Sequence, residues 1–226
     1  MKIILLILLT LSTLFGAIGK VTALKGEAQL QRLEQVLPVD KGTPVEIMDL
    51  LETERASKVQ VILNDETVIT IGPTSSYYFE AYEDKSDTHV MMELKHGFFK
   101  IVTGKIGKIA PERFKVKTKA ATIGIRGTQF MASVAEERET IACSKGALVV
   151  ETETKTFELP AGMMLVYEDH SWSMYELDTA TFEPLLTQGS PITKTPLEQS
   201  REFLPDFSQS YTPLEQQIDK EHGQGF

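Results

Sequence analysis

Cysteine is nearly absent from this chain of 226 residues, which contains Cys143 alone. A single thiol cannot form an internal disulfide, and no cluster of thiolates is present to hold zinc. Cys143 lies among small and apolar residues, without a cluster of histidines or lysines beside it. We therefore expect it to be a small buried side chain and not a reactive nucleophile.

Recognisable catalytic and metal-binding motifs are also missing. The four histidines, none of which pairs with another at a metal-ligand spacing, are His89, His96, His170 and His222. Residues 169–171 hold the three residue types of a catalytic triad, but neighbours in sequence do not provide triad geometry. Residues 104–108 lack the spacing of a phosphate-binding loop. The sequence thus predicts no cofactor, no metal site and no catalytic residue.

Long apolar runs are confined to the N-terminus. Residues 1–17 consist of one early lysine, an apolar stretch and the small residues Gly16 and Ala17, which is the layout of a secretory signal peptide. The stretch is shorter than the roughly 20 apolar residues that a membrane span needs. We expect cleavage and a periplasmic protein that is not integral to the membrane. An uncleaved membrane anchor is the alternative.

An excess of positive charge is lacking too, since the formal net charge is −9. This balance argues against nucleic acid as a partner. One segment departs from it: residues 95–119 contain eight basic residues and one acid, a net charge of +7. Strand alternation would place Lys115, Lys117 and Lys119 of this segment on one face of the domain.

Two interpretations of this lysine face stay open. Its charges can be balanced by neighbouring acids, such as residues 136–137 or Glu151 and Glu153, in which case it is an ordinary solvated surface. The other interpretation is a binding face for an anionic envelope polymer or an acidic partner.

The sequence offers instead a succession of short runs with β-strand character. The clearest of them are residues 19–24, 27–32, 67–71, 77–82 and 89–94. They are rich in Val, Ile, Thr and aromatic residues, and glycine or polar turns separate them. No sustained helical period occurs before residue 178. We therefore expect an all-β domain over residues 18–177.

Several of these runs share a pattern in which a glycine stands between two strands. The glycines are Gly26, Gly97, Gly146 and Gly162. Repeated corners of this kind are typical of an irregular β-solenoid or β-helix-like arrangement. The uneven spacing keeps a sandwich or an irregular barrel open as alternatives.

Residues 120–130 form the stretch around which we expect this domain to be organised. Its apolar residues alternate in a way that can face a core, while Gly124 and Gly127 indicate a bulge or a close backbone approach. Arg126 lies between the two glycines. We expect its guanidinium, with several fixed donors, to tie neighbouring loops together.

The composition changes after residue 177, where prolines occur among glutamines and serines. The sequence Thr-Pro-Leu-Glu-Gln appears twice, at residues 195–199 and 212–216. Threonine suits an N-cap, proline the first helical position and glutamate the third, as in a capping box. We expect two short helices in a C-terminal tail, residues 178–226. A partner-binding motif is the other interpretation of the repeat.

Four stretches together resemble the FecR domain family: residues 19–21, 66–75, 94–97 and 118–130. The likeness covers residues 19–151 and is most specific around Gly124, Arg126, Gly127 and Thr128, which match the family's signature. It implies an exported, mostly β domain in which these four residues have an architectural role. Family members include inner-membrane sigma-factor regulators, which relay a signal from an outer-membrane iron-siderophore receptor, and stand-alone envelope proteins.

The resemblance implies the stand-alone type here, because the β domain follows the leader without an anti-sigma segment or a membrane helix. We expect a non-enzymatic periplasmic interaction domain that binds an envelope protein or an anionic envelope polymer. One alternative is a sensory module that passes a ligand or receptor state to a separate membrane protein. Another is an envelope glycan hydrolase, which needs two carboxylates about 5 to 10 Å apart in a cleft.

Overall fold

The structure, a computed structural model, describes residues 16–83 and 89–177. Nearly all of the signal peptide and the whole tail, with its two expected helices, lie outside the described residues. Within them the regular secondary structure is β-strand apart from α1 and one 3-10 turn, which confirms the predicted all-β class. Inside the described ranges no helix is long and apolar enough to cross a membrane.

The described elements are β1 (Gly19–Lys25), β2 (Ala28–Arg32), β3 (Gln35–Pro38), β4 (Pro44–Val45), β5 (Leu50–Thr53), β6 (Lys58–Leu63), β7 (Val68–Ile71), β8 (Ser76–Glu83), β9 (His89–Val102), α1 (Ile106–Ile109), the 3-10 turn η1 (Pro111–Arg113), β10 (Phe114–Lys117), β11 (Ala121–Val134), β12 (Glu139–Thr152), β13 (Thr156–Pro160), β14 (Met163–Glu168) and β15 (Ser171–Glu176).

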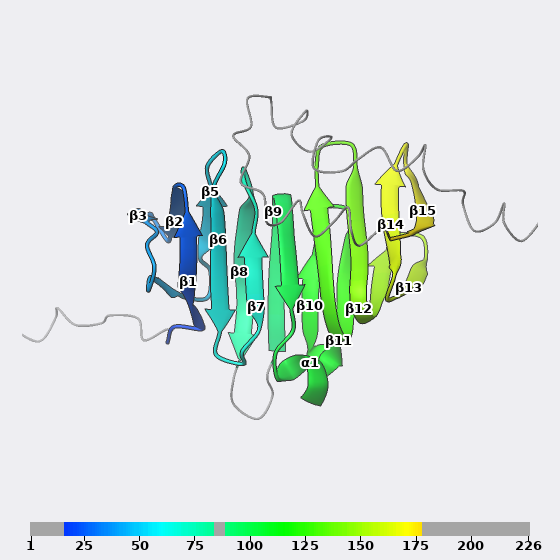
Figure 1. The fold of residues 1–226 in the computed structure, drawn as a ribbon, viewed down its shortest axis with the longest axis horizontal. Coiled ribbons are helices and arrows are strands. Elements are labelled where there is room, and N and C mark those ends of the chain that lie inside the picture. Colours follow the sequence, from blue (N-terminus) through cyan, green and yellow to red (C-terminus); the bar gives the residue numbers. More distant parts are fainter. Residues whose placement is uncertain (1–15, 84–88, 178–226) are drawn as a thin grey trace, which may run out of the picture.

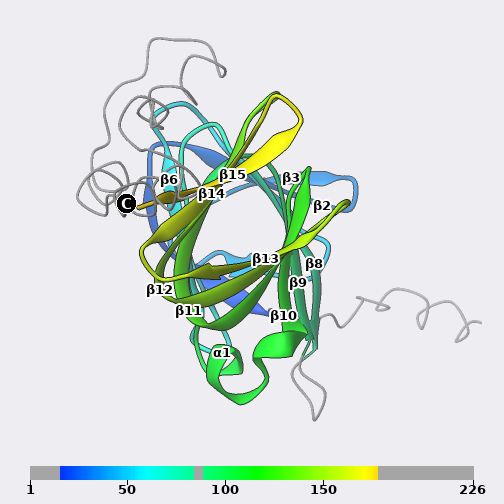
Figure 2. The same cartoon turned by 90° about the vertical axis from the view of Figure 1, so that its right-hand side faces the viewer.

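These fifteen strands form one continuous sheet that is folded into two walls. The first wall contains β4, β1, β6, β7, β14 and β15, and the second contains β3, β2, β5, β8, β10 and β13. The long strands β9, β11 and β12 belong to both, because each pairs with one wall in its first half and with the other in its second half. From β1 and β2 the later strands advance along the long axis, with β3 and β4 at the N-terminal end (Figure 1). A view down that axis shows the walls around a common centre (Figure 2).

The core lies between the walls because the strands alternate in burial. In β6 every second residue is buried, ending with Leu63, and the same alternation runs through β7 and the first half of β9. Four rings join the walls at the centre: Tyr77 and Phe79 come from the second wall, and Phe99 and Phe130 from the first. Their edge-to-face contacts, with centroids 5.2 to 5.7 Å apart, are the favoured geometry of aromatic pairs.

The predicted glycine corners are confirmed. Gly26, Gly97, Gly146 and Gly162 all have positive φ, between 77° and 101°, and each stands where the chain passes from one wall to the other. At Gly146 a Cβ atom would lie 2.5 Å from the carbonyl oxygen of Gly127, so glycine is also required by close packing. Residues 19–25 and 28–32 are strands as expected. They flank the Gly26 corner and belong to different walls, so they do not pair with each other.

The arrangement combines two of the expected folds. The walls face each other as in a sandwich, yet continuous strands join them at the corners as in a solenoid. Neighbouring strands are antiparallel, except that β10 pairs parallel to β9, among the strands that the structure describes. The short α1 and η1 carry the chain from the end of β9 in the first wall to β10 in the second, which lets β10 run parallel to β9.

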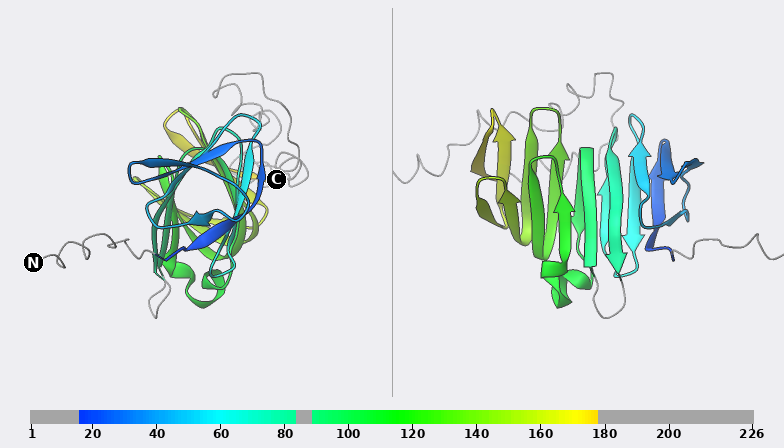
Figure 3. Two further views of the ribbon diagram at one scale, coloured as in Figure 1. Left: turned by 90° about the vertical axis from the view of Figure 1, so that its left-hand side faces the viewer. Right: turned by 180° about the vertical axis from the view of Figure 1, so that it is seen from behind.

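Most crossings occur at opposite edges in the two halves of the domain. The exception is residues 46–49, which pass from β4 to β5 at the lower edge of the N-terminal half. At the upper edge, the one away from α1 in Figure 1, the chain crosses in the N-terminal half at Gly26, Ser57, Ser75 and Gly97. In the C-terminal half it crosses at the lower edge, where α1 lies. The upper edge there carries only turns that return within one wall, such as residues 135–138 between β11 and β12. Figure 3 shows both halves from the far side.

Candidate functional site

The family signature forms a corner of β11, and its arginine does not join neighbouring loops as expected. Ile125 faces the core and Arg126 therefore points outward, where its side chain is exposed. The prediction that its guanidinium ties loops together is wrong. Gly127 has φ 60°, and the register shift between Arg126 and Gln129 confirms the expected bulge. Gly124 lies within the regular part of the strand, opposite Val149.

Hydroxyl and backbone groups hold this corner in place of the guanidinium. The Thr103 hydroxyl donates to the Thr128 carbonyl oxygen at 3.0 Å and accepts from the Thr128 N–H at 2.9 Å. A Cβ on Gly127 would lie 3.3 Å from the Gly107 carbonyl oxygen, so α1 packs directly against the turn. The signature residues Gly127 and Thr128 thus join the end of β9 to β11 through their backbone.

An arginine that does tie loops together is Arg32, at the lower edge of the N-terminal half. Its guanidinium binds both oxygens of Asp49 at 2.8 Å, Glu46 at 2.6 Å and the Pro44 carbonyl at 3.0 Å. The Asp49 side chain is completely buried. Residues 46–49 pass between the walls at this edge, from β4 to β5, and the ion pair fastens them to the end of β2. Sequence reasoning missed the role because Arg32 is not flanked by a recognisable motif.

The three predicted lysines are each engaged by an acceptor. Lys117 Nζ lies 3.0 and 3.1 Å from the two Glu80 carboxylate oxygens, and Lys115 Nζ lies 3.6 Å from Glu151. Lys119 follows the end of β10 in a loop, where its Nζ donates to the carbonyl oxygen of Glu136 at 2.8 Å. The strand face therefore carries only the first two lysines, and these contacts favour the charge-balanced interpretation.

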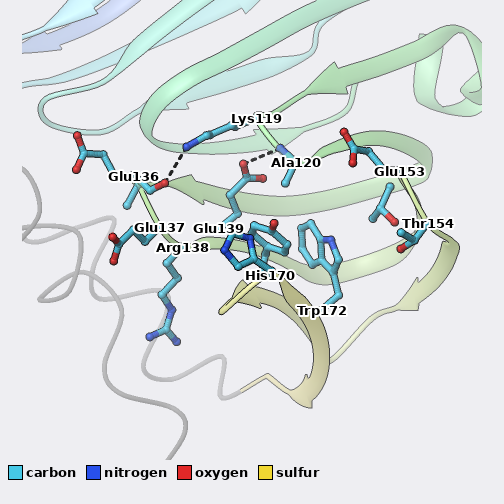
Figure 4. A pocket seen from close by; sticks show the side chains of 13 residues that line it. Lys119, Ala120, Glu136, Glu137, Arg138, Glu139, Glu153, Thr154, His170 and Trp172 are labelled. Carbon is cyan, nitrogen blue, oxygen red and sulfur yellow. Dashed lines mark hydrogen bonds between the residues drawn. The ribbon is translucent and has the colours of Figure 1, made fainter.

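A pocket of about 360 Å³ opens at the upper edge of the C-terminal half. Four turns or strand ends line it: residues 119–120, 135–139 and 152–154, together with Tyr167, His170 and Trp172 around the β14–β15 turn (Figure 4). The pocket exists because neighbouring strands are here joined by hairpin turns within each wall, so no crossing segment fills the space between the walls.

Glu139, the first residue of β12, is the buried polar group of this pocket. It is 2% exposed, and one carboxylate oxygen accepts a hydrogen bond from the Ala120 N–H at 2.8 Å. The other oxygen, Oε2, is buried and has no hydrogen-bond partner among the described residues. Burial raises the pKa of the Glu139 carboxyl, and the nearby Thr118 hydroxyl, the Ala120 N–H and the Lys119 charge offset part of this rise.

Aromatic side chains form the other side of the pocket. Trp172, the only tryptophan of the chain, lies with its ring centroid 5.0 Å from that of Tyr167 and 6.3 Å from that of Phe157. The charged residues of the lining are Lys119 and Arg138 against four glutamates, at positions 136, 137, 139 and 153. The pocket therefore offers an apolar surface, unused acceptor capacity and an excess of negative charge.

The sequence did not single out this pocket, although it drew attention to His170. Asp169 and His170 both have positive φ and form the tight β14–β15 turn, while the Ser171 hydroxyl donates to the Glu168 carbonyl at 3.2 Å and not to His170. Cys143 is buried as expected, and burial raises the pKa of its thiol to about 11. Across residues 16–83 and 89–177, no group of three His, Cys, Asp or Glu side chains could hold a metal ion.

The two-walled β-domain with glycine corners belongs to a known class. Residues 49–149 match the model of the FecR protein family, a range that runs from the turn before β5 into β12 and includes the signature corner. This stretch is similar to the FecR family, in agreement with the resemblance found in the sequence. No curated protein matches the chain.

Two crystal structures share the fold. They show a protein from Parabacteroides distasonis ATCC 8503, provisionally described as an anti-sigma factor, at 1.65 and 2.50 Å resolution. Each aligns with a TM-score of 0.53 and 18% sequence identity over 62% of this chain. The alignment covers 65% and 64% of those chains, which is less than two thirds of their length.

Proposed function

We propose that this chain is a non-enzymatic FecR-type interaction module of the periplasm, and that it binds an envelope protein at the upper edge of its C-terminal half. The observation that carries the proposal is the pocket around Glu139. It combines a buried acceptor without a partner and half-buried aromatic side chains, and an unpaired buried acceptor costs stability in the free protein. A partner that supplies a donor would recover this loss.

The direct test is site-specific photocrosslinking of the exported protein in cells. A crosslinking residue at Thr154, on the rim of the pocket, should capture a discrete envelope protein. The same residue at Glu158, an exposed position of β13 outside the pocket lining, should not. Equal capture at both positions, or none at either, would contradict a binding site at this edge.

The location in the periplasm rests on the predicted signal peptide. Cell fractionation should find the protein in the periplasmic fraction, and sequencing of its N-terminus should show that the apolar leader has been removed. Recovery of the intact leader in the membrane fraction would support the uncleaved anchor instead.

An anionic envelope polymer is the other partner that the sequence suggested. Reversal of Lys115, Lys117 and Lys119 to glutamate should then abolish salt-sensitive retention on such a polymer. Reversal of Lys20, Lys25 and Lys41, which are exposed in the N-terminal half, makes the same change in net charge elsewhere. Unchanged retention of the first variant would remove the idea.

A sensory module is a second candidate function, favoured by the similarity to the FecR family and by the description of this chain's structural neighbours as anti-sigma factors. In that case the captured partner is a separate membrane signalling protein, and loss of this chain changes expression of the genes that the partner controls. A structural envelope partner with no transcriptional response would favour the simpler interaction module.

Hydrolysis of envelope glycans can be tested on the same protein. A carboxyl with a raised pKa in a pocket is also what a general acid requires. The proposal expects no release of reducing ends from peptidoglycan fragments. Release that disappears in a Glu139→Gln variant would replace the proposal with the enzymatic alternative.

A further inference from the structure

The domain has two buried carboxylates at opposite edges of its two halves, and only one of them is paired with a cation. Asp49 closes the lower edge of the N-terminal half together with Arg32, which binds both of its oxygens at 2.8 Å. Glu139 occupies the corresponding place at the upper edge of the C-terminal half. Its Oε1 binds a backbone N–H, and no described donor reaches its Oε2. The comparison indicates what Glu139 Oε2 lacks, which is a positively charged donor.

The surroundings of Glu139 favour a cation over a neutral donor. An ionised carboxylate is an acceptor only, so the missing group must donate. The charged groups that face it are Lys119 from the β10–β11 loop, Glu136, Glu137 and Arg138 from the β11–β12 turn, Glu153 from the β12–β13 turn, and His170 from the β14–β15 turn.

Both cations of this lining have contacts away from Glu139, and the Nε–H of Arg138 is buried without a hydrogen-bond partner among the described residues. Lys119 donates to the Glu136 carbonyl oxygen, and Arg138 Nη1 lies 3.6 Å from Glu168 Oε2. The ring of Trp172 can also face a cation, an interaction that the π-electron surface of tryptophan favours most among the aromatic residues.

We propose that the pocket binds a primary ammonium group, presented as a lysine side chain of the partner protein, with Glu139 as its carboxylate and Trp172 and Tyr167 beside its alkyl chain. The inference rests on the proposed function, because it assumes a protein partner at this edge. It adds the chemistry that the partner must present. The pocket volume of about 360 Å³ lies within the range of sites that hold small ligands or single side chains.

The single tryptophan allows a direct binding test on the full-length exported chain. The probe is the tripeptide Gly-Lys-Gly, acetylated at its N-terminus and amidated at its C-terminus, so that the ε-ammonium is its only charge. It should change the fluorescence of Trp172 in a saturable way at about pH 8. The same peptide with an acetylated lysine should bind at least ~10-fold more weakly, because the charge and the charge-assisted hydrogen bond are lost.

Variants separate Glu139 from general surface charge. Glu139→Gln should weaken binding of the lysine probe at least ~10-fold, since an amide keeps the hydrogen bond from Ala120 and removes the negative charge. Glu158→Gln removes a carboxylate outside the pocket and should leave binding unchanged. Equal affinity of the two peptides, or full affinity of Glu139→Gln, would overturn the proposal. Binding of maltotriose that ignores Glu139→Gln would show a carbohydrate site instead.

The pH dependence provides a readout that does not need a variant at Glu139. Binding should strengthen from about pH 5 to about pH 8, because an ammonium ion requires the ionised carboxylate. Carboxyl NMR should show a lower pKa of Glu139 in the presence of the probe. A His170→Asn variant should keep this dependence, which excludes titration of the imidazole as its cause. An unchanged Glu139 pKa with saturating probe would also overturn the proposal.

Failure of this inference and failure of the proposed function are distinguishable. If photocrosslinking at Thr154 captures a partner and the lysine probe does not bind, the edge is an interface with a different chemistry. If the probe binds and no partner is captured, the ammonium site stands and the proposed protein partner does not.

Discussion

The lower edge of the N-terminal half and the upper edge of the C-terminal half each contain a buried carboxylate, but the two carboxylates have different partners. In the N-terminal half, Arg32 supplies the cation for the buried carboxylate of Asp49, and the edge is closed by residues of the chain itself. In the C-terminal half, Glu139 is buried to a similar degree and keeps one oxygen without a partner, beside a pocket. A carboxylate that is fully paired serves stability, and one that is half-paired is available for binding.

The segments that cross between the walls hold them at a fixed separation in both halves of the domain. Gly97→Ala should therefore have the largest effect, about 3 kcal/mol or more of lost unfolding free energy. Its φ is 101°, and a Cβ would overlap the Ser75 side chain and lie 2.5 Å from the Ser75 Cα. Gly42→Ala is the matched control, because Gly42 has φ 98° and open space around it. It should cost about 1 kcal/mol in urea unfolding. Equal costs would show that packing at the crossing is unimportant.

Removal of the internal cation tests the closed edge. Arg32→Ala leaves the buried Asp49 carboxylate without its partner and should cost about 3 kcal/mol, measured by urea unfolding. Arg126→Ala is the control and should change stability by no more than about 0.5 kcal/mol, since its side chain is exposed. A larger loss at Arg126 than at Arg32 would restore the role that the sequence suggested for the signature arginine.

The open edge should show its unpaired carboxylate as a pH dependence of stability. Burial raises the folded-state pKa of Glu139 above the ordinary value of 4.5, so folding favours its protonated form. The stabilising contribution is present below that value and is lost as the pH rises through the folded-state pKa. Unfolding measured from about pH 4 to about pH 8 should show wild type losing stability relative to Glu139→Gln. A constant difference between the two proteins would contradict a raised pKa.

A substitution can add a cation to the pocket at the upper edge of the C-terminal half. Thr154→Lys places an ammonium group on the rim of the pocket and should stabilise the protein by less than about 1 kcal/mol at neutral pH, with less gain in high salt. The same variant should weaken binding of the lysine peptide, because the two ammonium groups compete. Thr154→Met, of similar length and without charge, is the control. Tighter binding of the probe by Thr154→Lys would contradict the proposed site.

The architecture was predictable where local chemistry decides it. Alternating apolar residues identified the strands, and glycines at positions 26, 97, 146 and 162 marked the corners, because only glycine adopts their backbone conformation without strain. The buried thiol of Cys143 followed from its apolar neighbours. The family signature also identified the β11 corner.

The site was not predictable because it depends on pairing between distant strands. Glu139, Glu153 and Trp172 come together only when β12 has turned at the lower edge and returned, and no local pattern records that path. The same reason explains the error at Arg126. Its flanking glycines indicated a special backbone, but outward alternation beside Ile125 decided where the guanidinium points.

The path of β12 has a mechanical consequence. The strand starts at Glu139 on one side of the pocket, bends at Gly146 on the opposite edge of the domain, and ends at Thr152 on the other side of the same pocket. Its two halves form opposite sides of the pocket, and a single glycine corner joins them. β11 bends in the same way and pairs with β12, and its corner at Gly127 contacts Gly146. A partner that widens the pocket must therefore also move these two corners, which lie at the opposite edge of the domain beside the exposed Arg126.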